Sequence, residues 1–172
     1  TYAEPVLTGV YPFESFTEEE ILRLAACLEE HFPHPLGRAV VKAAEDRSLV
    51  HPEQHAKVEY IVAHGIASSL DDKRLCIGSA HFIFEDEHVP VSKAMARVQK
   101  TAAKAGYSLL YLAVDGKLAG ILTIGDPARE DAAATVAELK RLGVQTCVML
   151  TGDAEQAAAK IAAQTGIAEY HA

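Results

Sequence analysis

Two apolar segments, residues 108–114 and 117–124, are separated only by Asp115-Gly116, and this feature constrains the fold more than any other. An Asp-Gly pair between two strand-like runs is the strongest short-range signal for a tight β-hairpin. A two-residue turn can join only antiparallel neighbours, so this part of the chain must build an antiparallel sheet. The longest apolar run, residues 109–114, is far shorter than the ~20 residues that a membrane-spanning helix needs.

The residues before the hairpin predict helices that cover this sheet. Thr17 and Glu20 form a capping box, which opens a helix that ends before Pro33. Further predicted elements, in chain order, are a helix at 36–47, strands at 57–66 and 74–77 paired with each other, a short helix at 80–84, and a helix at 90–105 that Gly106 closes.

The pattern changes after the hairpin. The strand at 121–124 is followed by a helix at 129–142, a strand at 144–150 and a helix at 155–164. This order is typical of a parallel sheet with covering helices. The expected fold is an α+β antiparallel sheet with helices, followed by a partial α/β parallel Rossmann-like segment. We expect a lead-in at 1–16, one module at 17–118 and the partial segment at 119–172.

Composition narrows the function classes. A formal net charge of -8 over 172 residues argues against nucleic acid as the main partner. Cys27, Cys76 and Cys147 are isolated and form no C-x-x-C pair, so we expect reduced thiols and no structural zinc site. No basic stretch precedes an apolar run at the N-terminus, so a signal peptide is not expected, and the chain as given predicts a soluble, intracellular protein.

Two strands of the tail end in a Gly-Asp pair just before a helix, at Asp126 and at Gly152-Asp153. Side chains at the carboxyl ends of parallel strands converge on one edge of a sheet, and helix N-termini favour phosphate there. The Thr151 hydroxyl could add a hydrogen bond to a phosphoryl oxygen. A phosphate or Mg²⁺ site is therefore one interpretation, and simple helix caps with turn-forming glycines are the other.

A second group of candidates surrounds two prolines. His31 and His34 are three residues apart, but Pro33 removes the helix that would align them on a metal ion. The default is a corner between two helices with exposed imidazoles, where Glu29 could share a pocket with His34 across the turn. Glycines at strand ends, Gly65 and Gly78, usually mark turns or bulges.

Three segments together resemble heavy-metal (P1B-type) P-type ATPases. Residues 24–41, with His34-Pro35 at their centre, look like the His-Pro segment of that family's nucleotide-binding domain. Residues 120–129 resemble its strand entering the Asp-Pro-x-Arg motif of the phosphorylation domain, which is haloacid-dehalogenase-like. Residues 149–153, Met-Leu-Thr-Gly-Asp, followed by Thr165-Gly166-Ile167, are similar to a third motif. The three occur in the family's order and span essentially the whole chain.

The resemblance implies roles for individual residues. It implies ATP binding by Glu29, His34, Gly65, Gly78 and Ser79. It implies a phosphoryl site, served by Mg²⁺, at Thr151, Gly152, Asp153, Asp126 and Arg129. The family's usual first glycine and the acidic residue before its His are replaced here by Ala63 and Pro33.

The chain contains neither the D-K-T-G-T-L-T motif, whose Asp the family phosphorylates, nor its G-D-G-x-N-D loop. We therefore expect a fragment of a cation-transporting membrane protein, located on the cytoplasmic face, that binds ATP or ADP without hydrolysing it. Its partners would be the remaining phosphorylation, actuator and transmembrane domains. Two alternatives stay open: a phosphatase of the haloacid dehalogenase class, which would need a D-x-D motif at a strand end, and a non-catalytic interaction module.

Overall fold

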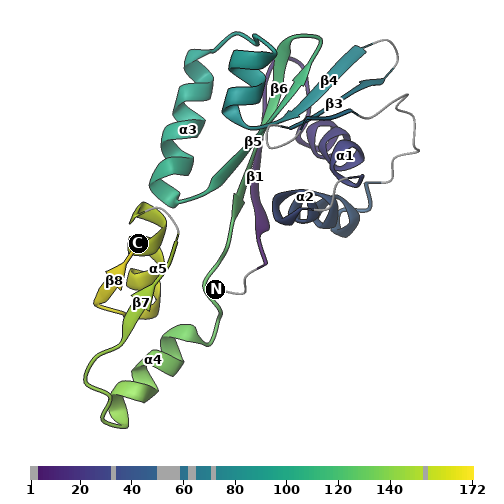
Figure 1. Cartoon of the computed structure of the whole chain (residues 1–172). Coiled ribbons are helices and arrows are strands. Elements are labelled where there is room, and N and C mark those ends of the chain that lie inside the picture. The colour runs from purple at the N-terminus through teal and green to yellow at the C-terminus, as the bar shows by residue number, and fades with distance from the viewer. Residues whose placement is uncertain (1–3, 32–33, 50–58, 62–64, 71–72, 153–154) are drawn as a thin grey trace.

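The computed structural model describes residues 4–31, 34–49, 59–61, 65–70, 73–152 and 155–172. Its main feature is a six-stranded sheet in the order β1-β6-β5-β4-β3-β2, in which every neighbouring pair is antiparallel (Figure 1). The strands are β1 (Val6–Pro12), β2 (Glu59–Ile61), β3 (Gly65–Leu70), β4 (Lys73–Gly78), β5 (Ser108–Val114) and β6 (Lys117–Gly125). The predicted hairpin is confirmed as β5 and β6.

Helices cover both faces of this sheet. One face packs against α1 (Glu18–Glu29) and α2 (Pro35–Asp46), and the other against the π-helix η1 (Phe82–Asp86) and α3 (Lys93–Ala105). Residues of β5 alternate between the two cores, because successive side chains of a strand point to opposite faces. Leu110 and Leu112 enter the first core, whereas Tyr111 and Ala113 enter the second.

Gly120, just after a bulge in β6, lets α1 approach the sheet closely. The register between β5 and β6 shifts at Ala113, which pairs with Leu118, whereas Leu112 pairs with Gly120. A Cβ atom at Gly120 would lie 2.7 Å from a methyl carbon of Ile21, which is fully buried in α1. The absence of a side chain at this position therefore sets how deeply α1 sits against the sheet.

The tail forms a smaller unit below the sheet (Figure 1). It consists of α4 (Ala132–Arg141), β7 (Val148–Leu150), α5 (Glu155–Thr165) and β8 (Glu169–His171), and β7 and β8 pair in parallel around α5. The expected parallel segment is thus present, but the strand that neighbours β7 is β8, which the sequence pattern did not predict. The strand at 121–124 belongs to β6 in the antiparallel sheet.

Several boundaries differ from the prediction. The expected strand at 57–66 is wrong as one element, because Tyr60 in β2 pairs antiparallel with Ile66 in β3, and residues 57–58 and 62–64 of that range lie outside the described residues. It is β3, rather than β2, that pairs with β4. The helix expected from Arg129 begins at Ala132, and the strand expected from Val144 begins at Val148. The short helix expected at 80–84 continues as η1 to Asp86. The boundaries proposed after residues 16 and 118 stay a prediction, and the second falls inside β6.

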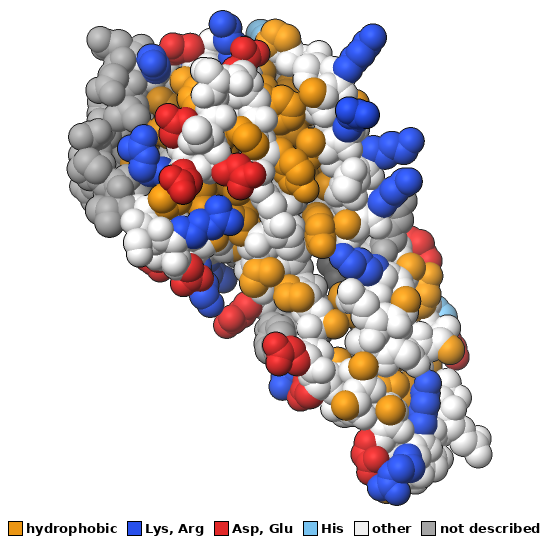
Figure 2. Space-filling view, turned by 180° about the vertical axis from the view of Figure 1, so that it is seen from behind, with side chains coloured by type: hydrophobic (Ala, Val, Ile, Leu, Met, Phe, Trp, Pro, Cys, Tyr) orange, Lys and Arg blue, Asp and Glu red, His pale blue; other side chains and the backbone are white. Residues whose placement is uncertain are grey.

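Charge is unevenly distributed over the surface. Basic side chains line one edge of the upper body in the space-filling view from behind (Figure 2). The helix α3 has four exposed basic residues and no acidic one: Lys93, Arg97, Lys100 and Lys104. The excess of negative charge therefore lies on the other elements. Within the described part of the chain, no helix combines the length and the hydropathy required to cross a bilayer.

The capping box at the start of α1 gives a first testable prediction. The Thr17 hydroxyl accepts a hydrogen bond from the Glu20 amide at 3.2 Å, and the Thr17 amide donates to the Glu20 carboxylate at 2.8 Å. We expect Thr17→Ala to lower the free energy of unfolding by about 1 kcal/mol, since an orphan amide of the first turn loses its acceptor. Urea denaturation measures this. The matched control is Thr101→Ala, whose hydroxyl bonds within α3, and an equal loss there would contradict a capping effect.

Candidate functional site

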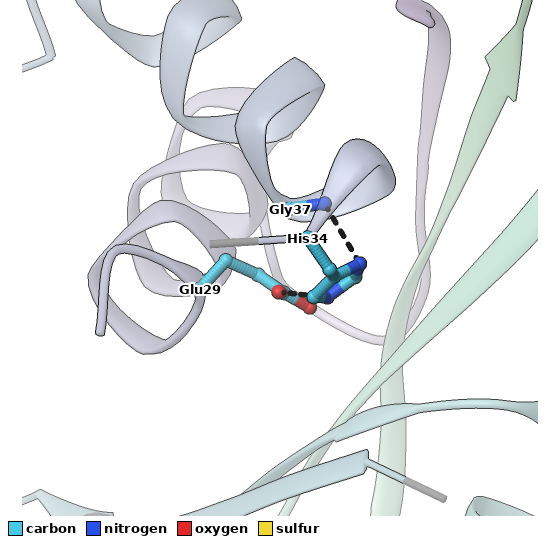
Figure 3. A network of polar contacts seen from close by, with 3 residues as sticks. All are labelled: Glu29, His34 and Gly37. Atoms are coloured by element: carbon cyan, nitrogen blue, oxygen red, sulfur yellow. Dashed lines mark hydrogen bonds and ion pairs between the residues drawn. The ribbon is translucent and has the colours of Figure 1, made fainter. Parts of the chain in front are cut away.

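The centre of the first candidate site is a contact between Glu29 and His34. Nε2 of His34 lies 2.7 Å from Oε2 of Glu29 (Figure 3). The Glu29 side chain is only 1% exposed, whereas the His34 side chain is 39% exposed. The sequence-based expectation that these residues come together across the turn is confirmed. A buried carboxylate thus holds one edge of an imidazole whose other parts still meet solvent.

The two helices bring these residues together through their ends. Glu29 is the last residue of α1, and His34 is the N-cap of α2, with Pro35 in the first turn, where its missing amide hydrogen costs nothing. The Gly37 amide donates to Nδ1 of His34 at 3.4 Å. Because Nδ1 accepts this hydrogen bond, the proton of the neutral ring is on Nε2. The Nε2–H group then donates a hydrogen bond to Glu29.

Gly37 makes room for this arrangement. A Cβ atom at this position would lie 2.5 Å from Oε2 of Glu29 and 3.2 Å from Nε2 of His34. Gly37 was not among the residues expected from the sequence. Its position two residues after the His-Pro pair was the available signal, since a glycine in the first turn of a helix often marks a close approach.

The contact with Glu29 shifts the pKa of His34. The hydrogen bond to Glu29 raises the pKa of His34 above its ordinary value, and this outweighs burial and the nearby Arg38, which both lower it. A raised pKa means that the folded state holds the proton more tightly than the unfolded state. The stabilisation of the folded state by protonated His34 is therefore fully present at pH values below the ordinary pKa of histidine. It is lost as the pH rises through the raised pKa of His34.

We accordingly expect Glu29→Gln to lower the pKa of His34. An NMR titration that follows the imidazole of His34 measures this directly. Glu30→Gln is the matched control, because Glu30 is the next residue and lies near His31 rather than His34. A His34 pKa that is the same in all three proteins would show that the Glu29 contact does not govern the ring.

The two predicted glycines face each other across neighbouring strands. Gly65 opens β3, Gly78 ends β4, and they are directly paired in the sheet. A Cβ atom at Gly65 would collide with the carbonyl oxygen of Ile77 and with the Phe82 ring. The hydroxyl of Ser79 accepts from the Phe82 amide at 3.2 Å and so begins the turn into η1. Ala63, which departs from the family pattern, lies outside the described residues, as does Pro33.

A groove of about 570 Å³ lies beside the buried carboxylate. It runs between the start of β1 and the outer face of α2, and its lining includes Glu29, Glu30, Arg38 and Lys42. Neither His34 nor the two glycines line it. The glycine pair therefore belongs to a part of the sheet that this groove does not include.

The described candidates of the tail contact residues outside the expected site. Arg129 pairs with Asp131 at 3.2 Å, and the Thr151 amide donates to the carbonyl of His171 in β8 at 3.0 Å. Asp126 is exposed and lines a second cavity, and it does not cap α4, since the N-cap of that helix is Asp131. A Cβ atom added at Gly152 would meet no other atom within 4 Å. Asp153 lies outside the described residues.

The expected convergence of two parallel strand ends is not observed, because β6 and β7 lie in different sheets. Asp126 and Thr151, two of the residues expected at a phosphoryl site, therefore do not share a sheet edge. Across the described residues, no three His, Cys, Asp or Glu side chains cluster in a way that could hold a metal ion.

The chain matches the family model of haloacid dehalogenase-like hydrolases over residues 1–171. The curated zinc-exporting P-type ATPase of Mycobacterium marinum is 35% identical over 173 residues, which cover 100% of this chain and 23% of that protein. The copper-exporting P-type ATPase of Bacillus subtilis is 32% identical over 168 residues, covering 98% of this chain and 20% of that protein. The chain thus spans about a quarter or less of the length of these relatives.

Solved structures of P-type ATPases are also similar to this chain. A zinc-transporting PIB-type ATPase in the E2.Pi state superposes with a TM-score of 0.83 and 31% identity, covering 98% of this chain and 26% of that one. The N-domain of HMA6, a copper-transporting P-type ATPase, superposes with a TM-score of 0.55 over 71% of this chain and 99% of its own. At 24% identity this second match supports the fold alone.

Proposed function

The chain belongs to the haloacid dehalogenase-like hydrolase family, and from its similarity to heavy-metal P-type ATPases we propose that it is the ATP-binding cytosolic part of an ATP-driven exporter of heavy-metal cations. Its homologues are heavy-metal P-type ATPases, as the sequence motifs indicated. The remaining phosphorylation, actuator and transmembrane domains of such a pump would be its partners, at the cytoplasmic face of the membrane.

The observation that carries this proposal is the Glu29–His34 pair. A ring that is 39% exposed can still contact a nucleotide, whereas a carboxylate that is 1% exposed cannot without moving. We therefore assign direct nucleotide contact to His34, and Glu29 orients its ring. Gly65, Gly78 and Ser79 would bring backbone close to the ligand, because bare backbone allows such an approach.

Exposed apolar side chains in the tail support a larger assembly. Leu142 is 68% exposed and Leu150 is 77% exposed, and α4 has no buried residue. In the proposed pump, the rest of the phosphorylation domain would cover this surface. The nucleophilic Asp of that family is absent from these residues, so in this proposal the chain binds ATP without hydrolysing it. Mg²⁺ would neutralise phosphate charge and would come with ATP, and Thr151, Asp126 and Asp153 stay the residues expected from the sequence to serve it.

Calorimetric titration with Mg-ATP tests the proposal. His34→Ala should weaken binding by about tenfold or more, the loss expected for one charge-assisted contact. His31→Ala, the nearby histidine, is the control and should bind as the native chain does. If Glu29 acts through His34, Glu29→Gln should weaken binding in the native background and change nothing further in His34→Ala.

Two results would count against this function. Equal, undetectable binding by the native chain and His34→Ala would favour the interaction module, to which the residues Ala63 and Pro33 give some weight. Phosphate release that persists after repurification, and that Thr151→Ala abolishes, would instead favour a phosphatase.

A further inference from the structure

The sheet unit and the tail meet where α5 lies beneath the C-terminal end of α3 (Figure 1). The contact is close because Gly106 ends α3 with a positive φ of 67°, and a Cβ atom there would lie 2.6 Å from Ala157 of α5. Small residues on both sides thus let a helix end rest directly on the side of another helix.

Lys160, one turn further along α5, reaches across this contact. Its ammonium group donates to the carbonyl of Ala105 at 3.3 Å and to the hydroxyl of Tyr107 at 3.1 Å, and it lies 4.3 Å from the centre of the Tyr107 ring. The last carbonyls of a helix lack partners within the helix and carry partial negative charge. A cation placed there satisfies an orphan acceptor and favours the helix dipole.

Tyr107 extends the contact to the connection between the units. A Cβ atom at Gly125 would lie 2.8 Å from Cδ1 of Tyr107, so the ring packs on bare backbone at the end of β6, directly before Asp126. The chain leaves the sheet at this point and enters the tail. The ring is therefore held between Lys160 on one side and the connecting segment on the other.

A cavity of about 370 Å³ lies beside the same residues. Its lining includes Thr8 from β1, Asp126 from the connection, and Lys160 with Gln164 from α5. Space at the junction means that the tail is not fixed by continuous packing. The orientation of the tail relative to the sheet unit then depends on a few contacts, such as those that Lys160 makes.

We propose that Lys160 is a positioning residue that, through Tyr107 and the Ala105 carbonyl, sets the resting orientation of the tail against the sheet unit. The importance of this orientation for phosphoryl transfer rests on the proposed function. In that function, a nucleotide near His34 must reach residues of the tail. The positioning itself holds whether or not the chain binds ATP.

The experiment measures a distance distribution between spin labels at Glu19 in α1 and Ala163 in α5, both exposed, in the whole chain with Cys147→Ser and without nucleotide. Lys160→Met keeps most of the stem and removes the charge, and it should widen the distribution. Lys160→Arg keeps the charge and should restore the native width. Lys140→Met is the matched control, since Lys140 donates to the Gly166 carbonyl at 2.7 Å within the tail.

A second variant keeps the result interpretable. Ala157→Leu inserts bulk between α5 and Gly106, so it should shift the distribution even though Lys160 is present. Amide exchange at Tyr107, whose N–H donates to Ala102 at 3.0 Å, should become about tenfold faster in Lys160→Met, the change expected for one charge-assisted hydrogen bond. A Lys160→Met distribution that matches the native one, or a Lys140→Met distribution equally wide, would overturn the proposal. Because no nucleotide is used, either result leaves the ATP-binding function to be decided by its own titration.

Discussion

Replacing Phe82 by alanine should lower the free energy of unfolding by about 3–5 kcal/mol, the usual cost of removing a buried aromatic ring. Phe82 is 1% exposed and belongs to the second core, between the sheet and the η1–α3 layer. Removing its ring leaves a cavity, because the neighbouring Gly65 is held in a paired strand and has no side chain that could fill the space. Domains of this size are stable by only about 5–15 kcal/mol, so a large share of the total would be lost.

Urea denaturation followed by circular dichroism measures this loss. Phe84→Ala is the matched control, because Phe84 lies in the same π-helix but is only partly buried, against Tyr111 with ring centres 5.0 Å apart. A smaller loss is expected there. Equal losses in the two variants would mean that η1 contributes as a whole rather than through the Phe82 ring.

Local signals in the sequence predicted local structure well. The Thr17 capping box, the Asp115-Gly116 hairpin and the closing glycine at Gly106 are all confirmed, since each depends on residues a few positions apart. Two strand pairings were missed, a distant one between β1 and β6 and a local one between β2 and β3. Nothing near β1 shows that it adds to β6, more than 100 residues away, and the split between β2 and β3 depends on their mutual register.

The candidate site divides in the same way. The contact between Glu29 and His34 follows from a turn between two helices and was predicted. Gly65 and Gly78 were expected at the ends of two paired strands, but their direct pairing depends on sheet register, which the sequence does not specify. Lys160 has no local signal at all, because its partners lie 53 and 55 residues away.

Replacing Gly65 by alanine should lower the free energy of unfolding by about 1–3 kcal/mol, the usual cost of forcing an extra carbon into a packed site. The added Cβ would meet both a backbone oxygen, at Ile77, and an aromatic ring, at Phe82. A ring can turn aside, but a carbonyl within a paired strand cannot move without breaking the ladder. Gly152→Ala is the control, because nothing lies within 4 Å there, and its effect should stay within about 0.5 kcal/mol.

The double variant Gly65→Ala with Phe82→Ala distinguishes the clash with the Phe82 ring from the clash with the Ile77 carbonyl. If the Phe82 ring is the main obstacle, Gly65→Ala should cost little once Phe82 is alanine, and the pair should deviate from additivity by about 0.5–3 kcal/mol. If the Ile77 carbonyl dominates, the costs should add. A second measurement is ATP binding by Gly65→Ala. If the costs add and the variant is folded but still fails to bind ATP, Gly65 contacts the nucleotide. Weaker binding that merely follows the loss of stability would assign it to packing alone, because an unfolded fraction binds no ligand.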